Sequence, residues 1–194
     1  MATLKTIRES KDKSLLSLCI VEGEEKLFYN VTKSVYAEIG SPCVGDGISD
    51  EDLCALEYAD RLFQAEKKAL AILAYADNNQ RSLMQKLLRA GFDRDISRQV
   101  CERMVELGYI NEKRQIERLI LVEANSKLRG PGRIVPALVS KGYNSTDVIS
   151  ILRHLCEIGE VDLQENANRL LEKKNPDGDP EERKKILFKN GYKL

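Results

Sequence analysis

Apolar residues recur at intervals of three and four through most of the chain beyond residue 50, a spacing typical of amphipathic helices. The pattern predicts one long helix over about 50–77, which Ser49 caps at its start. Asn79 can cap the helix that follows. From the last part of the long helix onward, the chain divides into repeats of three helices. We place the helices of the first repeat at about 66–77, 80–90 and 94–107, and those of the second at about 111–128, 132–141 and 145–158.

Glycines punctuate both repeats at the same places. Gly91 and Gly142 follow the middle helix, and Gly108 and Gly159 follow the third helix, so the members of each pair are 51 residues apart. Glycine readily adopts the left-handed conformation that closes the last turn of a helix. These positions are therefore predicted to be helix C-caps.

The end of each middle helix carries the same short phrase, in which a leucine is followed four residues later by glycine and then by an aromatic residue. The phrase occurs as Leu87–Phe92, Leu138–Tyr143 and Leu187–Tyr192. We expect each aromatic residue to fold back onto the preceding helical turn. A unit of about 50 residues was therefore copied. Because no reactive residue recurs within the copies, the repeat favours a binding surface over an active site.

The apolar stripe of the third helix is also preserved at an offset of 51 residues. We expect all of its positions to face a core. The matching pairs are Val100 and Ile151, Met104 and Leu155, Leu107 and Ile158, and Ile110 and Val161.

The residues before the repeats have a different pattern. Apolar runs at Leu15–Val21 and 26–29 flank a glycine-containing turn and predict a β-hairpin, to which residues 3–9 add a third strand. Val31, Val35 and Ile39 then predict a short helix.

The predicted fold is mainly α, with tandem three-helix repeats in an elongated array after a small N-terminal β-hairpin segment. The third repeat begins near Asp162 and is expected to be truncated to two helices. The expected divisions are 1–48 for the hairpin and short helix, 49–109 for the leading helix and first repeat, 110–160 for the second repeat, and 161–194 for the third.

Pro136 falls inside the middle helix of the second repeat, where an interior proline costs about 3 kcal/mol. A helix that begins near Arg133 would place this proline in its first turn, where the cost largely disappears. The start of this helix is therefore left open between Pro131 and Arg133.

Charge is unevenly distributed although the chain is formally neutral. The segment from Arg81 to Lys141 contains thirteen Lys and Arg against seven Asp and Glu, and both flanking segments are acidic. Basic residues gather on the middle helices and the turns before them, and these are the candidate partner-binding residues. They are Arg81, Lys86, Arg89, Lys127, Arg129, Arg133 and Lys141. Such a surface fits phosphates or an acidic protein equally well, and the ordinary solvated face of a helix explains it too.

The sequence contains little that suggests catalysis. His154 is the only histidine, and we expect it on a helix surface. Gly130–Arg133 lacks the downstream Gly-Lys-Ser/Thr of a phosphate-binding loop. The five cysteines show no metal-ligand spacing, and no apolar run is long enough to span a membrane. We therefore expect no catalytic site, metal or cofactor, and a cytoplasmic protein whose Cys101 and Cys156 pack in the helical core.

Taken in order, the motifs resemble the RecX family of bacterial recombination regulators. The resemblance rests on Leu83-x-x-Lys86-Leu87-x-x-x-Gly91-Phe92, Leu107-Gly108-Tyr109-Ile110, and Gly130-Pro131-x-Arg133-Ile134-x-x-x-Leu138-x-x-Lys141-Gly142, together with Ala69, Leu70 and Leu73. It covers about residues 60–160 well and the third repeat more loosely. The sequence departs from the family pattern at Ala76 and Ser82, where relatives carry a base and an acid. Ser82 removes the acid of a helix capping box.

The resemblance implies a monomeric regulatory protein that acts in DNA recombination, DNA repair and the SOS response. It would bind the RecA recombinase filament, inhibit ATP hydrolysis and strand exchange, and limit filament growth, with at most weak DNA contact. The alternative from the residues alone is a helical nucleic-acid-binding module that acts through the basic central segment.

Overall fold

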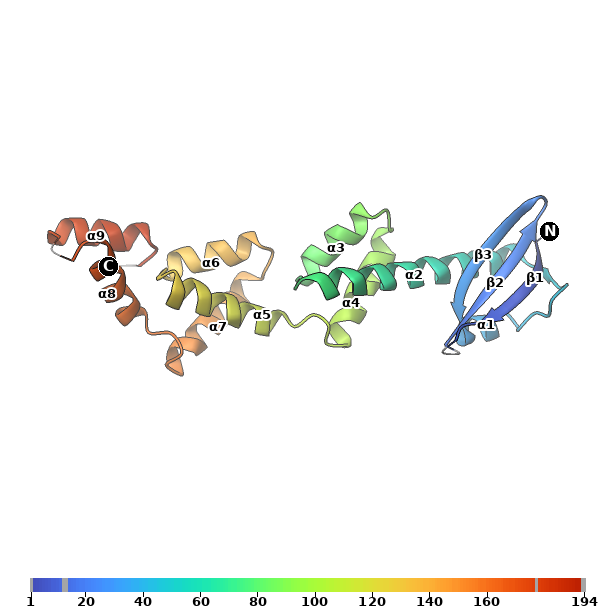
Figure 1. Ribbon diagram of the computed structural model, residues 1–194, viewed down its shortest axis with the longest axis horizontal. Helices are drawn as coiled ribbons and strands as arrows, with labels where there is room; N and C mark the ends of the chain where they lie inside the picture. The colour runs from blue at the N-terminus through green and yellow to red at the C-terminus, as the bar shows by residue number, and fades with distance from the viewer. Residues whose placement is uncertain (1, 12–13, 177, 193–194) are drawn as a thin grey trace. The chain divides into compact units, whose positions relative to one another are not determined.

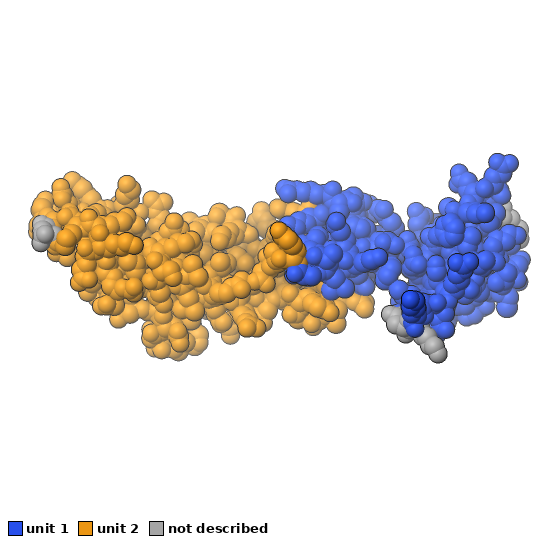
Figure 2. Space-filling model, in the orientation of Figure 1, with its two compact units in different colours: residues 1–74, 86–102 blue, residues 75–85, 103–194 orange. Residues whose placement is uncertain are grey.

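The computed structural model describes residues 2–11, 14–176 and 178–192, and its chain divides into two compact units (Figures 1 and 2). The first unit contains Met1–Ala74 and Lys86–Glu102, and the second contains Tyr75–Gln85 and Arg103–Leu194. The fold is mainly α, with a small antiparallel sheet near the N-terminus, as predicted. Among the described residues, no helix is long and apolar enough to cross a membrane.

The sheet of the first unit has the strand order β3-β2-β1-β4. Its strands are β1 (Ala2–Glu9), β2 (Leu15–Glu22), β3 (Glu25–Thr32) and β4 (Gly47–Ile48). The predicted hairpin and third strand are confirmed, whereas the two-residue β4 was not foreseen. Alternate residues of the strands, such as Leu4, Leu18 and Ile20, are buried together with Leu56 of the long helix over Asp50–Tyr75. One face of the sheet therefore forms a core with that helix.

The short helix α1 spans Lys33–Glu38 and begins later than the sequence suggested. Val31, which was assigned to the helix, continues the strand alternation of β3 and is buried in the sheet core. The helix begins after Thr32, whose hydroxyl accepts a hydrogen bond of 3.4 Å from the Val35 N–H. The alternation of buried and exposed residues thus continues to the end of β3 at Thr32, and the helix begins at the next residue.

The leading helix α2 spans Asp50–Tyr75 without interruption, which confirms the prediction. The Ser49 hydroxyl caps it by accepting a hydrogen bond of 3.1 Å from the Asp52 N–H. The other helices of the first repeat are α3 (Gln80–Arg89) and α4 (Arg94–Glu106).

The second repeat consists of α5 (Glu112–Leu121), a π-helical segment η1 (Val122–Ser126), α6 (Pro131–Ser140) and α7 (Ser145–Glu157). Buried apolar side chains from α5, α6 and α7 form one core, as predicted from the helical spacing. The third repeat contains α8 (Leu163–Lys174) and α9 (Pro180–Lys189), and Asp177 in the turn between them lies outside the described residues.

The glycines after the helices adopt the predicted left-handed conformation. Gly91, Gly142 and Gly191 have φ values of +87°, +100° and +88°. After α6 the Tyr143 N–H donates to the Leu138 carbonyl at 3.3 Å, and equivalent bonds follow α3 and α9. Because the aromatic residue returns to the start of the last turn, the recurring phrase is a helix-ending motif.

Two positions of the predicted apolar stripe are exposed. Leu107 and Ile158 are 58% and 56% exposed, whereas the other six positions are buried. Each of the two directly follows the last helical turn and precedes a left-handed glycine. Both lie at the end of their helices, where the chain turns away after the glycine and leaves them exposed, so this part of the prediction was wrong.

The structure decides between the two starts considered for α6, because the helix begins at Pro131 and Pro136 lies inside it. Pro131 occupies the first helical turn, where the absence of an N–H has no cost. Because proline has no N–H, the carbonyl of Gly132, four residues before Pro136, has no helical hydrogen-bond donor. Both residues are exposed. Water can therefore hydrate that carbonyl, which lowers the cost of the interior proline.

Candidate functional site

In the second compact unit, the end of α6 meets the start of α3. The Asn79 side-chain amide donates a hydrogen bond of 2.9 Å to the Lys141 carbonyl. The side chains of Asn79 and Arg81 lie so close to Gly142 that a Cβ there would be 3.1 Å from the Arg81 Cδ. Acceptors at the end of one middle helix therefore face donors at the start of another.

The end of α9 meets the start of α6 in the same way, here through backbone atoms. The N–H groups of Gly130 and Gly132 donate to the carbonyls of Asn190 and Gly191, each at 2.9 Å. A Cβ on Gly130 would lie 2.6 Å from the Gly191 backbone, and one on Gly191 would lie 2.4 Å from the Arg133 nitrogen. The glycines of the Gly-Pro-Gly-Arg segment therefore allow close packing against the third repeat.

These two junctions satisfy groups that helix ends leave without partners. The first N–H groups and the last carbonyls of a helix lack intrahelical hydrogen bonds, and the helix dipole makes the two ends opposite in partial charge. Joining the end of one middle helix to the start of another pairs such groups. The recurring Leu-x-x-x-Gly-aromatic phrase is consequently also the contact surface between repeats.

In the first compact unit, a side chain occupies the equivalent turn after α3. The Arg61 guanidinium of α2 donates to the Gly91 carbonyl at 3.0 Å and lies 5.7 Å from the centre of the Phe92 ring. It also lies 3.6 Å from the Asp93 carboxylate. A single side chain thus supplies the donor that a neighbouring repeat supplies elsewhere.

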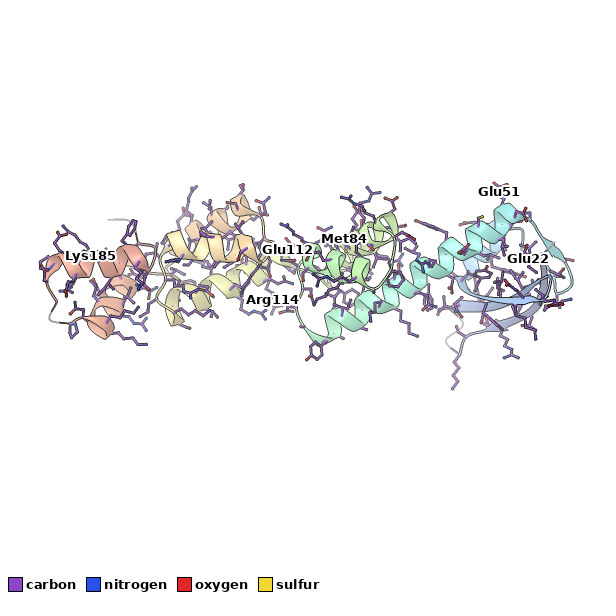
Figure 3. The ribbon with its side chains drawn as sticks, turned by 90° about the horizontal axis from the view of Figure 1, so that it is seen from above. Glu22, Glu51, Met84, Glu112, Arg114 and Lys185 are labelled. Atoms are coloured by element: carbon purple, nitrogen blue, oxygen red, sulfur yellow. The ribbon has the colours of Figure 1, made fainter. Side chains whose placement is uncertain are left out.

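Further polar groups hold the start of α3 against the second repeat. Asn79 caps α3 through a bond of 2.7 Å from the Ser82 N–H, as the sequence predicted. Glu112 of α5, labelled in Figure 3, accepts a bond of 2.8 Å from the Gln80 N–H. An acid from the next repeat therefore satisfies one of the free N–H groups at the start of α3.

A buried chain of hydrogen bonds completes this junction. The Tyr143 hydroxyl donates to the Gln115 side-chain oxygen at 2.9 Å, and the Gln115 amide donates to the Asn78 carbonyl at 3.2 Å. Burial raises the pKa of the Tyr143 hydroxyl, so it remains a neutral donor. The aromatic residue of the phrase thus bonds Gln115 within the second repeat, and Gln115 makes the contact to the first repeat.

Basic side chains line a cleft beside the second junction, where α6 and α9 meet. Its volume is about 570 Å³, and its basic residues are Arg129, Arg133 and Lys189. No acidic residue is among the described residues that line it. The Arg133 Nε donates to the Lys189 carbonyl at 3.0 Å, so the junction also positions one wall of the cleft. This basic cleft is the strongest candidate for binding an acidic or phosphate-bearing partner.

One buried carboxylate organises the approach to this cleft. Glu123 in η1 is 3% exposed, and its two oxygens accept bonds from Lys127 at 2.6 Å and Arg129 at 2.5 Å. Burial raises its pKa, but the hydrogen bonds and positive charges of Lys127 and Arg129 outweigh that effect and lower it overall. Glu123 therefore remains ionised and offsets part of the basic charge.

The seven candidate residues consequently fall into three groups. Lys86 and Arg89 are exposed on the last turns of α3 in the first compact unit. Lys127 and Arg129 share Glu123, and Arg133 lines the cleft. Arg81 and Lys141 are exposed at the first junction. Within the second compact unit, Arg81 and Lys141 belong to one junction and Arg133 to the other.

Two members of this region were missed in the sequence. Lys189 belongs to the third repeat, and nothing in the sequence indicated that it lies against α6. Glu123 lies four residues before Lys127, a spacing that predicts a helical ion pair and offered a usable signal.

Cys101, Cys156 and His154, which the sequence raised as possible chemistry, lie on helices. Burial raises the pKa of the Cys101 thiol to about 11, so it stays protonated, and burial also raises that of Cys156. His154 lies exposed on α7, as predicted. Within the described ranges, no group of three or more His, Cys, Asp or Glu side chains could hold a metal ion.

Comparison with known proteins identifies the family. The chain is 28% identical over 145 residues to the regulatory protein RecX of Clostridioides difficile (strain 630), and the match covers 75% of this chain. The chain is a RecX family protein. A second RecX regulatory protein, from Leuconostoc citreum (strain KM20), is 22% identical over 187 residues, or 90% of this chain. The matches span 66% and 70% of the lengths of these two relatives. No protein-family model matches the chain.

Solved RecX structures share the fold. A crystal structure of regulatory protein RecX matches the whole chain with a TM-score of 0.74 at 18% identity, and the match covers 95% of that structure. RecX from Lactobacillus salivarius matches 70% of this chain with a TM-score of 0.59 at 21% identity, and 91% of that structure is covered. The fold expected from the RecX resemblance is thereby confirmed.

Proposed function

We propose that this RecX family protein binds the RecA recombinase filament, inhibits its ATPase and strand-exchange activities, and limits filament growth. Membership of a family of regulatory proteins supports a binding role. The repeats support it as well, because they recur in fold and in contact surface while no reactive side chain recurs among them. The protein would act by occupying a surface of the filament.

The observation that carries the proposal is the basic cleft of Arg129, Arg133 and Lys189. Close backbone packing at Gly130, Gly132 and Gly191 holds its walls, so little conformational entropy would be lost when a partner binds. Complementary charge accelerates association and selects the partner. An acidic surface on the filament is the partner that this cleft fits.

The test is an ATPase titration with RecA from the same organism on single-stranded DNA. The wild-type chain should lower RecA turnover, and Lys189→Glu should weaken that inhibition about tenfold because it reverses one wall of the cleft. The Lys189 side chain takes part in no hydrogen bond or ion pair among the described residues, so this variant changes charge while leaving the junction intact. Arg133→Glu combined with Lys189→Glu should remove inhibition.

Matched charge reversals at Lys113 and Arg153 serve as the control, because both are exposed and lie outside the cleft. They should inhibit RecA as the wild-type chain does. If the wild-type chain neither binds RecA nor changes its turnover, the proposed function is wrong. If it inhibits RecA but the cleft variants inhibit equally well, the function holds and the cleft is not its site.

A further inference from the structure

The outer face of the N-terminal sheet carries a second basic surface, whose residues differ from those of the basic cleft. Leu18 and Ile20 of β2 point into the core, so the residues between them in the alternation point to the opposite face. That face has a hollow of about 520 Å³. Its lining includes Lys5, Arg8, Lys26, Phe28, Thr6 and Ser17.

Phe28 is the unusual member of this face. It is 63% exposed on β3, whereas the neighbouring Tyr29 and Val31 are buried on the core side. Strand register places Phe28 opposite Cys19 of β2, which in turn lies opposite Thr6 of β1. The ring therefore stands beside small side chains that leave its surface open.

The three bases surround this ring without acidic neighbours. None of Lys5, Arg8 and Lys26 forms an ion pair within the described part of the chain, and no lining residue is acidic. Glu9, at the end of β1, forms an ion pair with Lys33.

Glu22 and Glu25, which are paired at the end of the hairpin, have the core-side phase of their strands. The charge of Glu22, labelled in Figure 3, contributes to the raised pKa of Tyr29 on that side. Burial is the larger cause of that shift. The outer face consequently presents positive charge around an exposed aromatic ring.

We propose that this outer face of β1, β2 and β3 binds single-stranded nucleic acid. One base would stack on Phe28, while backbone phosphates contact Lys5, Arg8 and Lys26. A single strand supplies both flat π-surfaces and regularly spaced negative charges, and sheets that display aromatic rings among bases bind such strands. An acidic peptide would satisfy the three charges but would leave the ring without a flat partner. The proposal concerns the first compact unit and depends neither on the basic cleft nor on RecA.

The test uses the full chain and a labelled oligothymidylate at low salt. The chain contains no tryptophan, so Phe28→Trp introduces a single fluorescent reporter at the predicted stacking position. Binding should raise the anisotropy of the oligonucleotide and quench the tryptophan over the same concentration range. With three phosphate contacts, log K should fall with log [salt] at a slope of about −2.

Two pairs of variants locate the site. Phe28→Ala should weaken binding about tenfold through lost stacking, whereas Phe188→Ala, which truncates a ring 76% exposed on α9, should leave it unchanged. Reversing Lys5, Arg8 and Lys26 to Glu should abolish binding. Reversing Lys67, Lys68 and Lys113, which are also exposed, should weaken it only slightly. Thermal unfolding of each variant shows that the fold is intact.

Three results would overturn the proposal. The wild-type chain could fail to bind the oligonucleotide at low salt. Binding could survive both Phe28→Ala and the triple reversal, which would place it elsewhere, such as the basic cleft. Polyglutamate could displace the oligonucleotide at equal charge concentration with no quenching of the tryptophan by either polymer, which would assign the face to an acidic protein.

Discussion

The two junctions between middle helices share one geometry but differ in chemistry. Where α6 meets α3, side chains make the contacts, chiefly Asn79, Glu112 and Gln115. Where α9 meets α6, backbone groups make them, and glycines allow the two main chains to approach. Donors at a helix start can thus be satisfied by polar side chains or by another main chain. The first solution depends on particular functional groups, and the second on the absence of a Cβ.

The largest difference should appear when a methyl group is added to each junction. Gly191→Ala should lower the free energy of unfolding by about 3 kcal/mol or more, because left-handed strain adds to overlap with the Arg133 backbone. Gly142→Ala should cost only about 1–2 kcal/mol, since its nearest neighbours are side chains that can shift. Urea unfolding monitored by circular dichroism measures both. Equal losses would mean that the second junction is not closely packed in solution.

A smaller effect is expected from Glu123, whose partner Arg129 leads into the second junction. Glu123→Gln should cost about 1–3 kcal/mol at neutral pH, because two hydrogen bonds to charged groups are weakened. Glu172→Gln on the exposed face of α8 is the control and should have little effect.

The cost of Glu123→Gln should also depend on pH. The folded-state pKa of Glu123 lies below its usual value, so its stabilising contribution is fully present well above about pH 4.3 and is lost as pH falls through the folded pKa. Urea unfolding at a series of pH values should show the wild type and the variant converging in acid. A constant difference across that range would contradict the assigned ionisation.

The smallest effect separates the two tyrosines that end α6 and α9. Tyr143→Phe should cost about 1 kcal/mol, because it leaves the buried Gln115 oxygen without its donor. The Tyr192 hydroxyl is buried and has no hydrogen-bond partner among the described residues, so Tyr192→Phe should be neutral or slightly stabilising. Thermal unfolding of the two variants compares them directly. A larger loss at Tyr192 would show that its hydroxyl has a partner in solution.

Local signals in the sequence predicted the helices and strands. The features that the sequence did not predict depend on contacts between repeats. The left-handed glycines and the caps at Ser49 and Asn79 depend on neighbouring residues only, and these predictions were confirmed. The sequence left the start of α6 open between Pro131 and Arg133, and the observed start at Pro131 goes with close packing of Gly130 and Gly132 against Gly191, a contact between different repeats.

The candidate site was less predictable for the same reason. Lys189 joins Arg133 only through the fold, and the burial of Glu123 cannot be read from its spacing alone. Phe28 was visible as part of a strand, but the face to which it belongs follows from strand register.

The contact made by Arg61 gives the row of repeats a defined beginning. Each later repeat uses the turn after its middle helix to bind the helix start of the repeat before it, whereas Arg61 already occupies that turn in the first repeat. A further copy could not join on this side without displacing the guanidinium from the Gly91 carbonyl and the Phe92 ring. A copy added before the first repeat would therefore have to replace the contacts of Arg61, which no copy placed after the first repeat has to do.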